Sequence, residues 1–260
     1  MIELKGISKS FFSGYFSKKN HMAISDVSLC IKKGETIGLV GESGCGKSTL
    51  GRIAIRLIEP SAGKIWFDGV NLTELSKPAL RLIRPRMQMV FQDPDTVLDP
   101  RMTIGKSVAE PLWIWKGGVR HEDTDLIFET LETVGLHSDL ISRYPYELSG
   151  GQKQRAALAR ALILDPEFIV ADELSSALDL SIQAQILTLL KDIQKKRNLT
   201  LLFISHDLQV IRHMTDRVAV MKQGTIVEER RTSELFRSPE HQYTKQLINA
   251  AYLSKTSFRD

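Results

Sequence analysis

The chain has 260 residues, of which 42% are hydrophobic and 25% charged, and its formal net charge is only +4. These values are typical of a globular protein with a sizeable core, and they do not favour nucleic acid as a partner. No apolar run approaches the roughly 18 residues of a membrane-spanning helix, and no secretory segment begins the chain. The two cysteines form neither a disulfide framework nor a metal-ligand pattern, so we expect a reducing compartment.

The first 35 or so residues predict β-strands. Residues 1–7 are strand-like, and Val27, Leu29 and Ile31 alternate with polar residues before a turn at Gly34. Between these two segments lies an aromatic and basic stretch over 10–21, which we expect to be a loop.

The segment GESGCGKSTL at 41–50 contains three glycines, which are followed directly by the cation Lys47 and the hydroxyls of Ser48 and Thr49. An apolar run at 36–40 precedes it, and a helical pattern follows, with apolar residues at Leu50, Ile53, Ala54, Leu57 and Ile58. Glycine clusters also form ordinary turns, but the order strand, glycine loop, helix predicts a phosphate-binding loop. In such a loop Lys47 reaches the outer phosphates and the Ser48 hydroxyl ligates Mg²⁺.

From about Asp93 to Asp165 the pattern changes to helical segments interrupted by proline, which predicts a helical subdomain. Strand-like runs return at 168–171 and 200–205, and a helix is predicted between them with Ile182, Ile186, Leu189, Leu190 and Ile193 on one face. A hairpin around Gln223 and Gly224 follows. Short apolar strands joined by helices indicate an α/β fold with buried parallel strands.

Two adjacent acids, Asp172 and Glu173, follow the apolar strand at 168–171. Taken alone, such a pair is more often a solvated strand end. With the glycine loop upstream it favours a hydrolytic site in which Asp172 joins Ser48 around Mg²⁺ and Glu173 activates the attacking water.

The segment LSGGQ at 148–152 favours a more specific interpretation. Ser149 is predicted to be the N-cap of a helix over about 152–164, so that a hydroxyl, glycine N–H groups and a helix dipole face one anion. One chain cannot easily bring two such anion cradles to a single phosphate chain, whereas two copies arranged head to tail can.

On these motifs the sequence resembles the ATP-binding subunits of ABC transporters over nearly its whole length. The resemblance implies a P-loop NTPase core with a mixed, largely parallel sheet, an N-terminal antiparallel β subdomain and a helical subdomain, with ATP and Mg²⁺ as cofactors. It implies one domain over 1–253, with a core at about 1–92 and 166–253, a helical subdomain at about 93–165, and a polar tail at 254–260.

The resemblance also implies roles for single residues. The Walker A loop would comprise Gly41, Glu42, Ser43, Gly44, Cys45, Gly46, Lys47, Ser48 and Thr49, and the Walker B strand would run over 168–172. Catalysis would involve Glu173, His206, Lys47 and Gln92, while Mg²⁺ would be held by Ser48, Gln92 and Asp172. ATP would also contact Asp179 of the D-loop at 176–179 and the signature residues Ser149, Gly150, Gly151 and Gln152. The adenine would stack on Phe11, with Phe12 and Tyr15 as alternatives.

Two further stretches, 90–112 and 238–250, resemble the branch that imports peptides, nickel and related metal chelates. The sequence departs from that branch at 97–101, where Ser-Leu-Asn-Pro-Arg is usual, and at Leu174, where proline is usual. Longer peptide-importing relatives carry a C-terminal cysteine cluster that this chain lacks, which favours the shorter, nickel-type subunits. The transported substrate stays open.

The implied partners are integral-membrane permease subunits, a second ATPase subunit that is identical or homologous, and indirectly a substrate-binding protein. The implied location is peripheral, on the cytoplasmic face of the cell (inner) membrane. A soluble ABC ATPase, for example in phosphonate-pathway assembly, is the alternative, and a P-loop small-molecule kinase leaves LSGGQ without a role.

Two residue types have competing interpretations. Cys45, at a predicted helix N-terminus, is either a thiol of lowered pKa or a small residue that fits the loop. Trp113 and Trp115 favour packing or partner contact over a ligand site.

Overall fold

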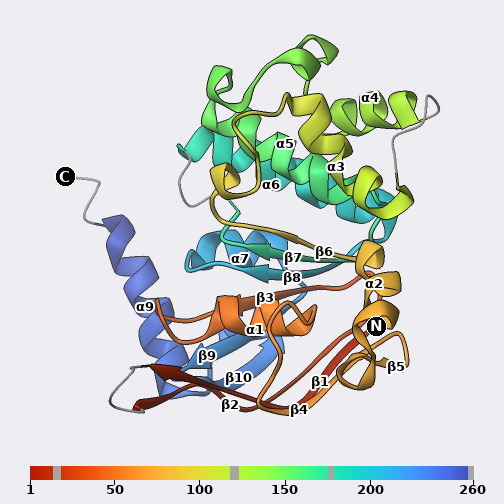
Figure 1. Cartoon of the computed structure of the whole chain (residues 1–260). Helices are drawn as coiled ribbons and strands as arrows, with labels where there is room; N and C mark the ends of the chain where they lie inside the picture. Colours follow the sequence, from red (N-terminus) through yellow and green to blue (C-terminus); the bar gives the residue numbers. More distant parts are fainter. Residues whose placement is uncertain (14–18, 118–122, 175–178, 257–260) are drawn as a thin grey trace. The chain divides into compact units, whose positions relative to one another are not determined.

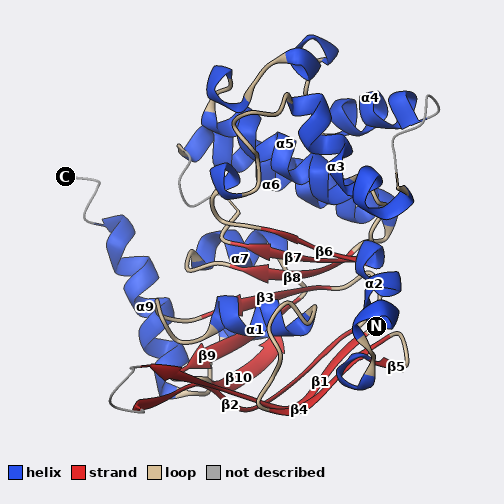
Figure 2. Ribbon diagram, in the orientation of Figure 1, coloured by secondary structure: helices blue, strands red, loops and turns tan. Residues whose placement is uncertain are grey.

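Figures 1 and 2 show a computed structural model of the chain, which describes residues 1–13, 19–117, 123–174 and 179–256. The chain divides into two units, of which the first comprises Met1–Lys77 with Thr200–Asp260 and the second comprises Pro78–Leu199. The bounds of these units differ from those of the core and helical subdomain expected from the sequence. The expected bounds stay a prediction.

The first unit contains an antiparallel sheet in which the strand order is β2-β1-β4-β5. Its strands are β1 (Ile2–Ser13), β2 (Lys19–Ile31), β4 (Ala62–Phe67) and β5 (Val70–Asn71). The predicted loop over 10–21 is wrong for residues 10–13 and 19–21, since Phe11 pairs with His21 in the ladder of β1 and β2. The aromatic residues suit a strand, and pairing with a neighbouring strand decides the outcome.

A second sheet of this unit contains β10, β9, β3 and β8 in that order. These strands are β3 (Thr36–Val40), β8 (Thr200–Ile204), β9 (Arg217–Lys222) and β10 (Thr225–Arg231). Strand β3 is parallel to both β8 and β9, and all residues of β3 and β8 are buried, which confirms the prediction of buried parallel strands. The predicted hairpin joins β9 to β10, with φ of +46° at Gln223 and +82° at Gly224.

The helices of the first unit include a short turn, η1 (Leu72–Glu74), and four α-helices: α1 (Lys47–Ala54), α7 (Leu208–Met214), α8 (Thr232–Arg237) and α9 (Gln242–Thr256). Helix α1 ends at Ala54 and does not include Leu57 and Ile58, which the sequence pattern placed in the helix. The cause is Arg56, which has a φ of +54° and whose guanidinium donates to the carbonyl oxygens of Leu72 and Leu75. Helix α9 continues to Thr256, so residues 254–256 of the expected tail are helical.

The second unit contains a parallel pair of strands, β6 (Met87–Val90) and β7 (Phe168–Asp172). Its helices are α2 (Lys77–Ile83, which begins on the last residue of the first unit's segment), α3 (Ile104–Lys116), α4 (Asp123–Thr133), α5 (Gly150–Leu162) and α6 (Leu180–Arg197). Short 3₁₀ turns lie at η2 (Arg84–Arg86), η3 (Pro94–Thr96), η4 (Ser138–Ser142) and η5 (Pro145–Glu147). Helix α5 packs against α3, α4 and α6, which confirms the helical character predicted for this region.

Within the described ranges, no helix combines the length and apolar character needed to span a membrane.

Candidate nucleotide-binding site

The glycine loop follows the buried strand β3 and is closed in by backbone from distant parts of the first unit. A Cβ atom on Gly41 would lie 2.1 Å from the carbonyl oxygen of Met221, and one on Gly46 would lie 2.5 Å from that of Ala23. Gly46 has a φ of +107°, which an L side chain rarely adopts. Gly41 also has a positive φ, +154°, so close packing and backbone conformation both require glycine at these two positions.

Lys47 begins α1 and is only 5% exposed. Its Nζ donates to the carbonyl oxygens of Gly41 and Glu42, each at 2.8 Å. A third and longer contact joins Nζ to Sγ of Cys45 at 3.9 Å, so the three donors of the ammonium group fold the lysine back across the loop. This arrangement suits the predicted role of Lys47 toward phosphate.

The N-terminus of α1 lies at the end of the loop. Among the described residues no side chain caps it, because the N-cap is Gly46. The first N–H groups of a helix have no partner within the helix, and the dipole there favours negative charge. Ser48 and Thr49 in the first turn are half-buried, so the segment from 43 to 49 has the chemistry of a phosphate cradle.

Cys45 lies inside this cradle and is 8% exposed. Burial raises the pKa of its thiol above the ordinary value, and the nearby Lys47 charge opposes that effect only in part. The alternative of a lowered thiol pKa is therefore wrong, because desolvation outweighs the positive surroundings. Cys45 acts as a small residue that fits the loop.

The two predicted acids lie at the end of β7 in the second unit. Asp172 is the last residue of the strand and is 3% exposed. Glu173 follows at a φ of +48°, a conformation that few non-glycine residues adopt. The strand therefore ends at Asp172, and the backbone turns at Glu173.

The signature segment forms a capping box at the start of α5. The Ser149 hydroxyl accepts a hydrogen bond from the N–H of Gln152 at 3.3 Å, and the Gln152 side chain accepts from the N–H of Ser149 at 2.9 Å. Ser149 and Gly150 are exposed, whereas Gly151 is buried. A Cβ atom added to Gly151 would lie 2.6 Å from the Cγ2 atom of Ile182. The predicted N-cap is confirmed, with the helix beginning at Gly150 rather than Gln152.

The remaining predicted residues lie at the ends of elements. Gln92 is exposed just after β6, and His206 is exposed between β8 and α7. Asp179 is the N-cap of α6, and hydrogen bonds from the N–H groups of Ile182 and Ser181 hold the pKa of its carboxyl below the ordinary value. Phe11 is 39% exposed on β1, beneath the Lys9 ammonium at 5.1 Å. Tyr15, the Phe12 side chain and D-loop residues 176–178 lie outside the described residues.

One contact of the loop was not predicted. Tyr243 of α9 is 4% exposed, and its hydroxyl accepts a hydrogen bond from the N–H of Glu42 at 3.1 Å. The stretch 238–250 resembles a transporter branch, but its sequence carries no signal for this contact.

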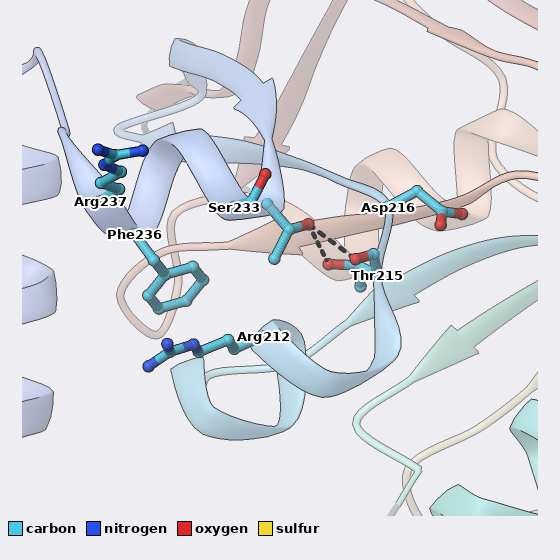
Figure 3. Close-up of a pocket in the computed structure, with 7 residues that line it drawn as sticks. Arg212, Thr215, Asp216, Ser233, Phe236 and Arg237 are labelled. Carbon is cyan, nitrogen blue, oxygen red and sulfur yellow. Dashed lines mark hydrogen bonds between the residues drawn. The ribbon is translucent and has the colours of Figure 1, made fainter.

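The cavity in Figure 3 is separate from the nucleotide loop. It measures about 650 Å³ and is lined by residues of α7, α8 and the turn before β9, among them Arg212, Phe236 and Arg237. The carboxylate of Asp216 at its edge accepts from the N–H of Thr36 at 2.8 Å, at the first residue of β3. The phosphate loop follows the last residue of β3, so the two features lie at opposite ends of this strand.

A buried strand, a glycine loop with a buried lysine, and a helix with an open N-terminus define a P-loop NTPase. Residues 24–176 match the family model described as "ABC transporter". The chain belongs to the ABC transporter family and is an ATPase of this type.

Several relatives and solved structures are similar over most of the chain. The oligopeptide transport ATP-binding protein OppF of Bacillus subtilis (strain 168) is 48% identical over 252 residues, which cover 96% of this chain and 82% of the relative. AppF of the same organism, also an oligopeptide transport ATP-binding protein, is 46% identical over 260 residues, covering 98% and 79%. The dimeric ATP-binding cassette MJ0796, bound to ADP and Pi, is 32% identical with a TM-score of 0.80, covering 89% of this chain and 99% of that one. The cbiO1 subunit of Clostridium perfringens, part of the cbiONQ transporter complex, is 25% identical with a TM-score of 0.80, covering 98% of both chains.

Proposed function

We propose that this chain is the ATP-hydrolysing subunit of a membrane transporter that imports peptides. The observation that carries the proposal is the identity of 46–48% to oligopeptide transport ATP-binding proteins over nearly the whole chain. Because these relatives carry peptide names, peptides replace the nickel-type substrate favoured by the sequence motifs. Their transport names also disfavour a soluble ATPase of a non-transport complex.

The phosphates of ATP would lie on the cradle of the first unit. N–H groups from Ser43 to Thr49 would donate to the β- and γ-phosphates, and Lys47 would neutralise charge on the outer phosphate in the ground state and in the transition state. The Phe11 ring, exposed at 39% on β1, would stack on the adenine. The half-buried Ser48 hydroxyl would face the metal-bound phosphate oxygens.

The proposed metal ligands fit Mg²⁺ by their chemistry, since Ser48, Asp172 and Gln92 offer a hydroxyl, a carboxylate and an amide oxygen. Bound Mg²⁺ would offset negative charge on the phosphates. The carboxylate of Glu173 would orient the attacking water and accept its proton, while the exposed His206 imidazole would donate to the γ-phosphate.

A second copy or a homologous subunit would complete the site. The exposed N-terminus of α5, with the Ser149 hydroxyl and Gly150 N–H, presents an anion-binding surface in the second unit. The cassette MJ0796 is described as dimeric with ADP and Pi bound, which supports a head-to-tail pair with ATP between a phosphate loop and the partner's signature segment. Asp179 would contribute to the same interface.

A permease subunit would bind the second unit at an apolar groove beside α3. The groove measures about 500 Å³, and its lining residues include Met102, Ala109 and Trp113. Trp113 is 63% exposed, and the neighbouring Ile114 is 57% exposed. Exposed apolar surface of this kind marks a contact site, and a short helix of the permease on the cytoplasmic side of the membrane would fill it. A substrate-binding protein would act on that permease, not on this chain.

The substitution Glu173→Gln tests the catalytic part of the proposal. It keeps the shape of the side chain but removes the base, so we expect ATP binding to persist, turnover to fall by at least about a hundredfold, and Mg²⁺-ATP to trap a dimer visible by size-exclusion chromatography. Wild-type protein would not accumulate this dimer. Steady-state hydrolysis by the variant close to the wild-type rate would refute the assignment.

Uptake of labelled oligopeptides tests the transport role. A strain lacking this gene is expected to lose uptake, and the wild-type copy is expected to restore it while Glu173→Gln does not. Unchanged peptide uptake together with loss of nickel uptake would overturn the assigned substrate class.

A further inference from the structure

The stretch 238–250 brings one side chain to the phosphate loop. The hydroxyl of the buried Tyr243 accepts from the N–H of Glu42 at 3.1 Å. Glu42 directly follows Gly41, where the loop leaves β3. The contact therefore lies at the start of the loop, two residues after the end of β3.

The position of Tyr243 is itself fixed by the start of α9. The Glu228 carboxylate of β10, 9% exposed, accepts from the N–H groups of Glu240 at 2.9 Å and His241 at 3.0 Å. The Nδ1 atom of His241 accepts from the N–H of Tyr243 at 3.1 Å, so His241 caps the helix that follows. These bonds tie the first turn of α9 to the sheet and leave Tyr243 little freedom.

A second contact holds the ring of Tyr243 and joins it to the hairpin beside the loop. The Lys222 ammonium lies 4.8 Å from the ring centroid, at the last residue of β9. Two residues later, the N–H of Gly224 donates to the carbonyl oxygen of Cys45 at 3.0 Å. The loop is thus held at Glu42 by α9 and at Cys45 by the hairpin.

Glu42 connects Tyr243, the anchor of the loop on α9, to Lys47. Its N–H donates to Tyr243, and its carbonyl oxygen accepts from Nζ of Lys47 at 2.8 Å. A shift of the Glu42 backbone would therefore move both the entrance of the loop and an acceptor of the lysine.

We propose that Tyr243 is a positioning residue that fixes Glu42, so that the loop N–H groups and Lys47 stay arranged to receive the phosphates of ATP. The inference rests on the proposed function, because it requires this loop to bind ATP. Tyr243 acts through Glu42 and does not touch the nucleotide.

The substitution Tyr243→Phe removes only the hydroxyl and keeps the ring against Lys222. We expect the Kd for ATP to rise about three- to tenfold, the effect of losing one hydrogen bond, with a parallel rise in KM and little change in kcat at saturating ATP. The amide proton of Glu42 is expected to exchange faster with D₂O. Tyr146→Phe is the matched control, since it removes the same hydroxyl from a ring that is 71% exposed in the other unit, and it should change neither quantity.

Two results would overturn the inference while leaving the proposed function intact. One is an unchanged Kd for ATP in Tyr243→Phe, including the case where only the melting temperature without nucleotide falls. The other is rapid exchange of the Glu42 amide in the wild-type protein, a measurement that does not depend on the variant folding. Failure of the wild-type protein to bind ATP would instead overturn the proposed function.

Discussion

Gly44 and Gly46 offer a test of why the loop is built from glycine. Both have positive φ, +79° and +107°, but a Cβ atom on Gly44 meets nothing within 4 Å, whereas one on Gly46 lies 2.5 Å from the carbonyl oxygen of Ala23. That oxygen belongs to the backbone of β2 and cannot rotate away. The two positions therefore share backbone strain, and only Gly46 adds a steric clash.

Gly44→Ala should lower the free energy of unfolding by about 1–2 kcal/mol, the strain of an L residue in the left-handed region. Gly46→Ala should lower it by about 2–5 kcal/mol, because about 1–3 kcal/mol of overpacking is added to the same strain. Urea unfolding of both variants without nucleotide measures the difference. Equal losses in the two variants would refute the argument that close packing against β2, and not φ alone, excludes side chains from position 46.

Two further predictions follow from pKa shifts. Because burial raises the pKa of Cys45, we expect iodoacetamide to label it more slowly at pH 7 than the exposed Cys30, as followed by mass spectrometry; equal rates would contradict its burial. The pKa of Glu228 is lowered because hydrogen bonds from Glu240 and His241 and the charge of Arg230 outweigh burial. The ionised Glu228 carboxylate therefore stabilises the fold fully above its unfolded-state pKa of about 4.3, and this stabilisation is lost as the pH falls below that value. Glu228→Gln should accordingly melt below wild type at pH 7, with a difference that shrinks towards pH 3; a difference independent of pH would contradict this account.

The features predicted correctly from sequence are those determined by neighbouring residues. The capping box of Ser149 and Gln152 spans four positions, and the hairpin at Gln223 and Gly224 needs only two residues of positive φ. The buried strands β3 and β8 were visible as apolar runs. In each case the signal lies within one short segment.

The wrong predictions concern contacts between distant segments. Residues 10–21 were predicted to be a loop, but Phe11 pairs with His21, and this pairing extends both strands. The apolar pattern of α1 continues past Ala54, yet Arg56 leaves the helix to donate to carbonyl oxygens 16 and 19 positions away. Cys45 lies among glycines next to a lysine, but burial, which sequence does not show, decides the direction of its pKa shift.

This difference explains why the phosphate loop was recognised and its anchor was not. An anion cradle is made of consecutive N–H groups, so its glycines, lysine and hydroxyls must stand at fixed spacing in the chain. An anchor needs a single hydroxyl at the right place, and any of the five tyrosines in the sequence offers one. Glu42 and Tyr243 are 201 positions apart, and only the docking of α9 on Glu228 brings them together. Residues that position a recognisable motif therefore leave no periodic signal and have to be found in the fold.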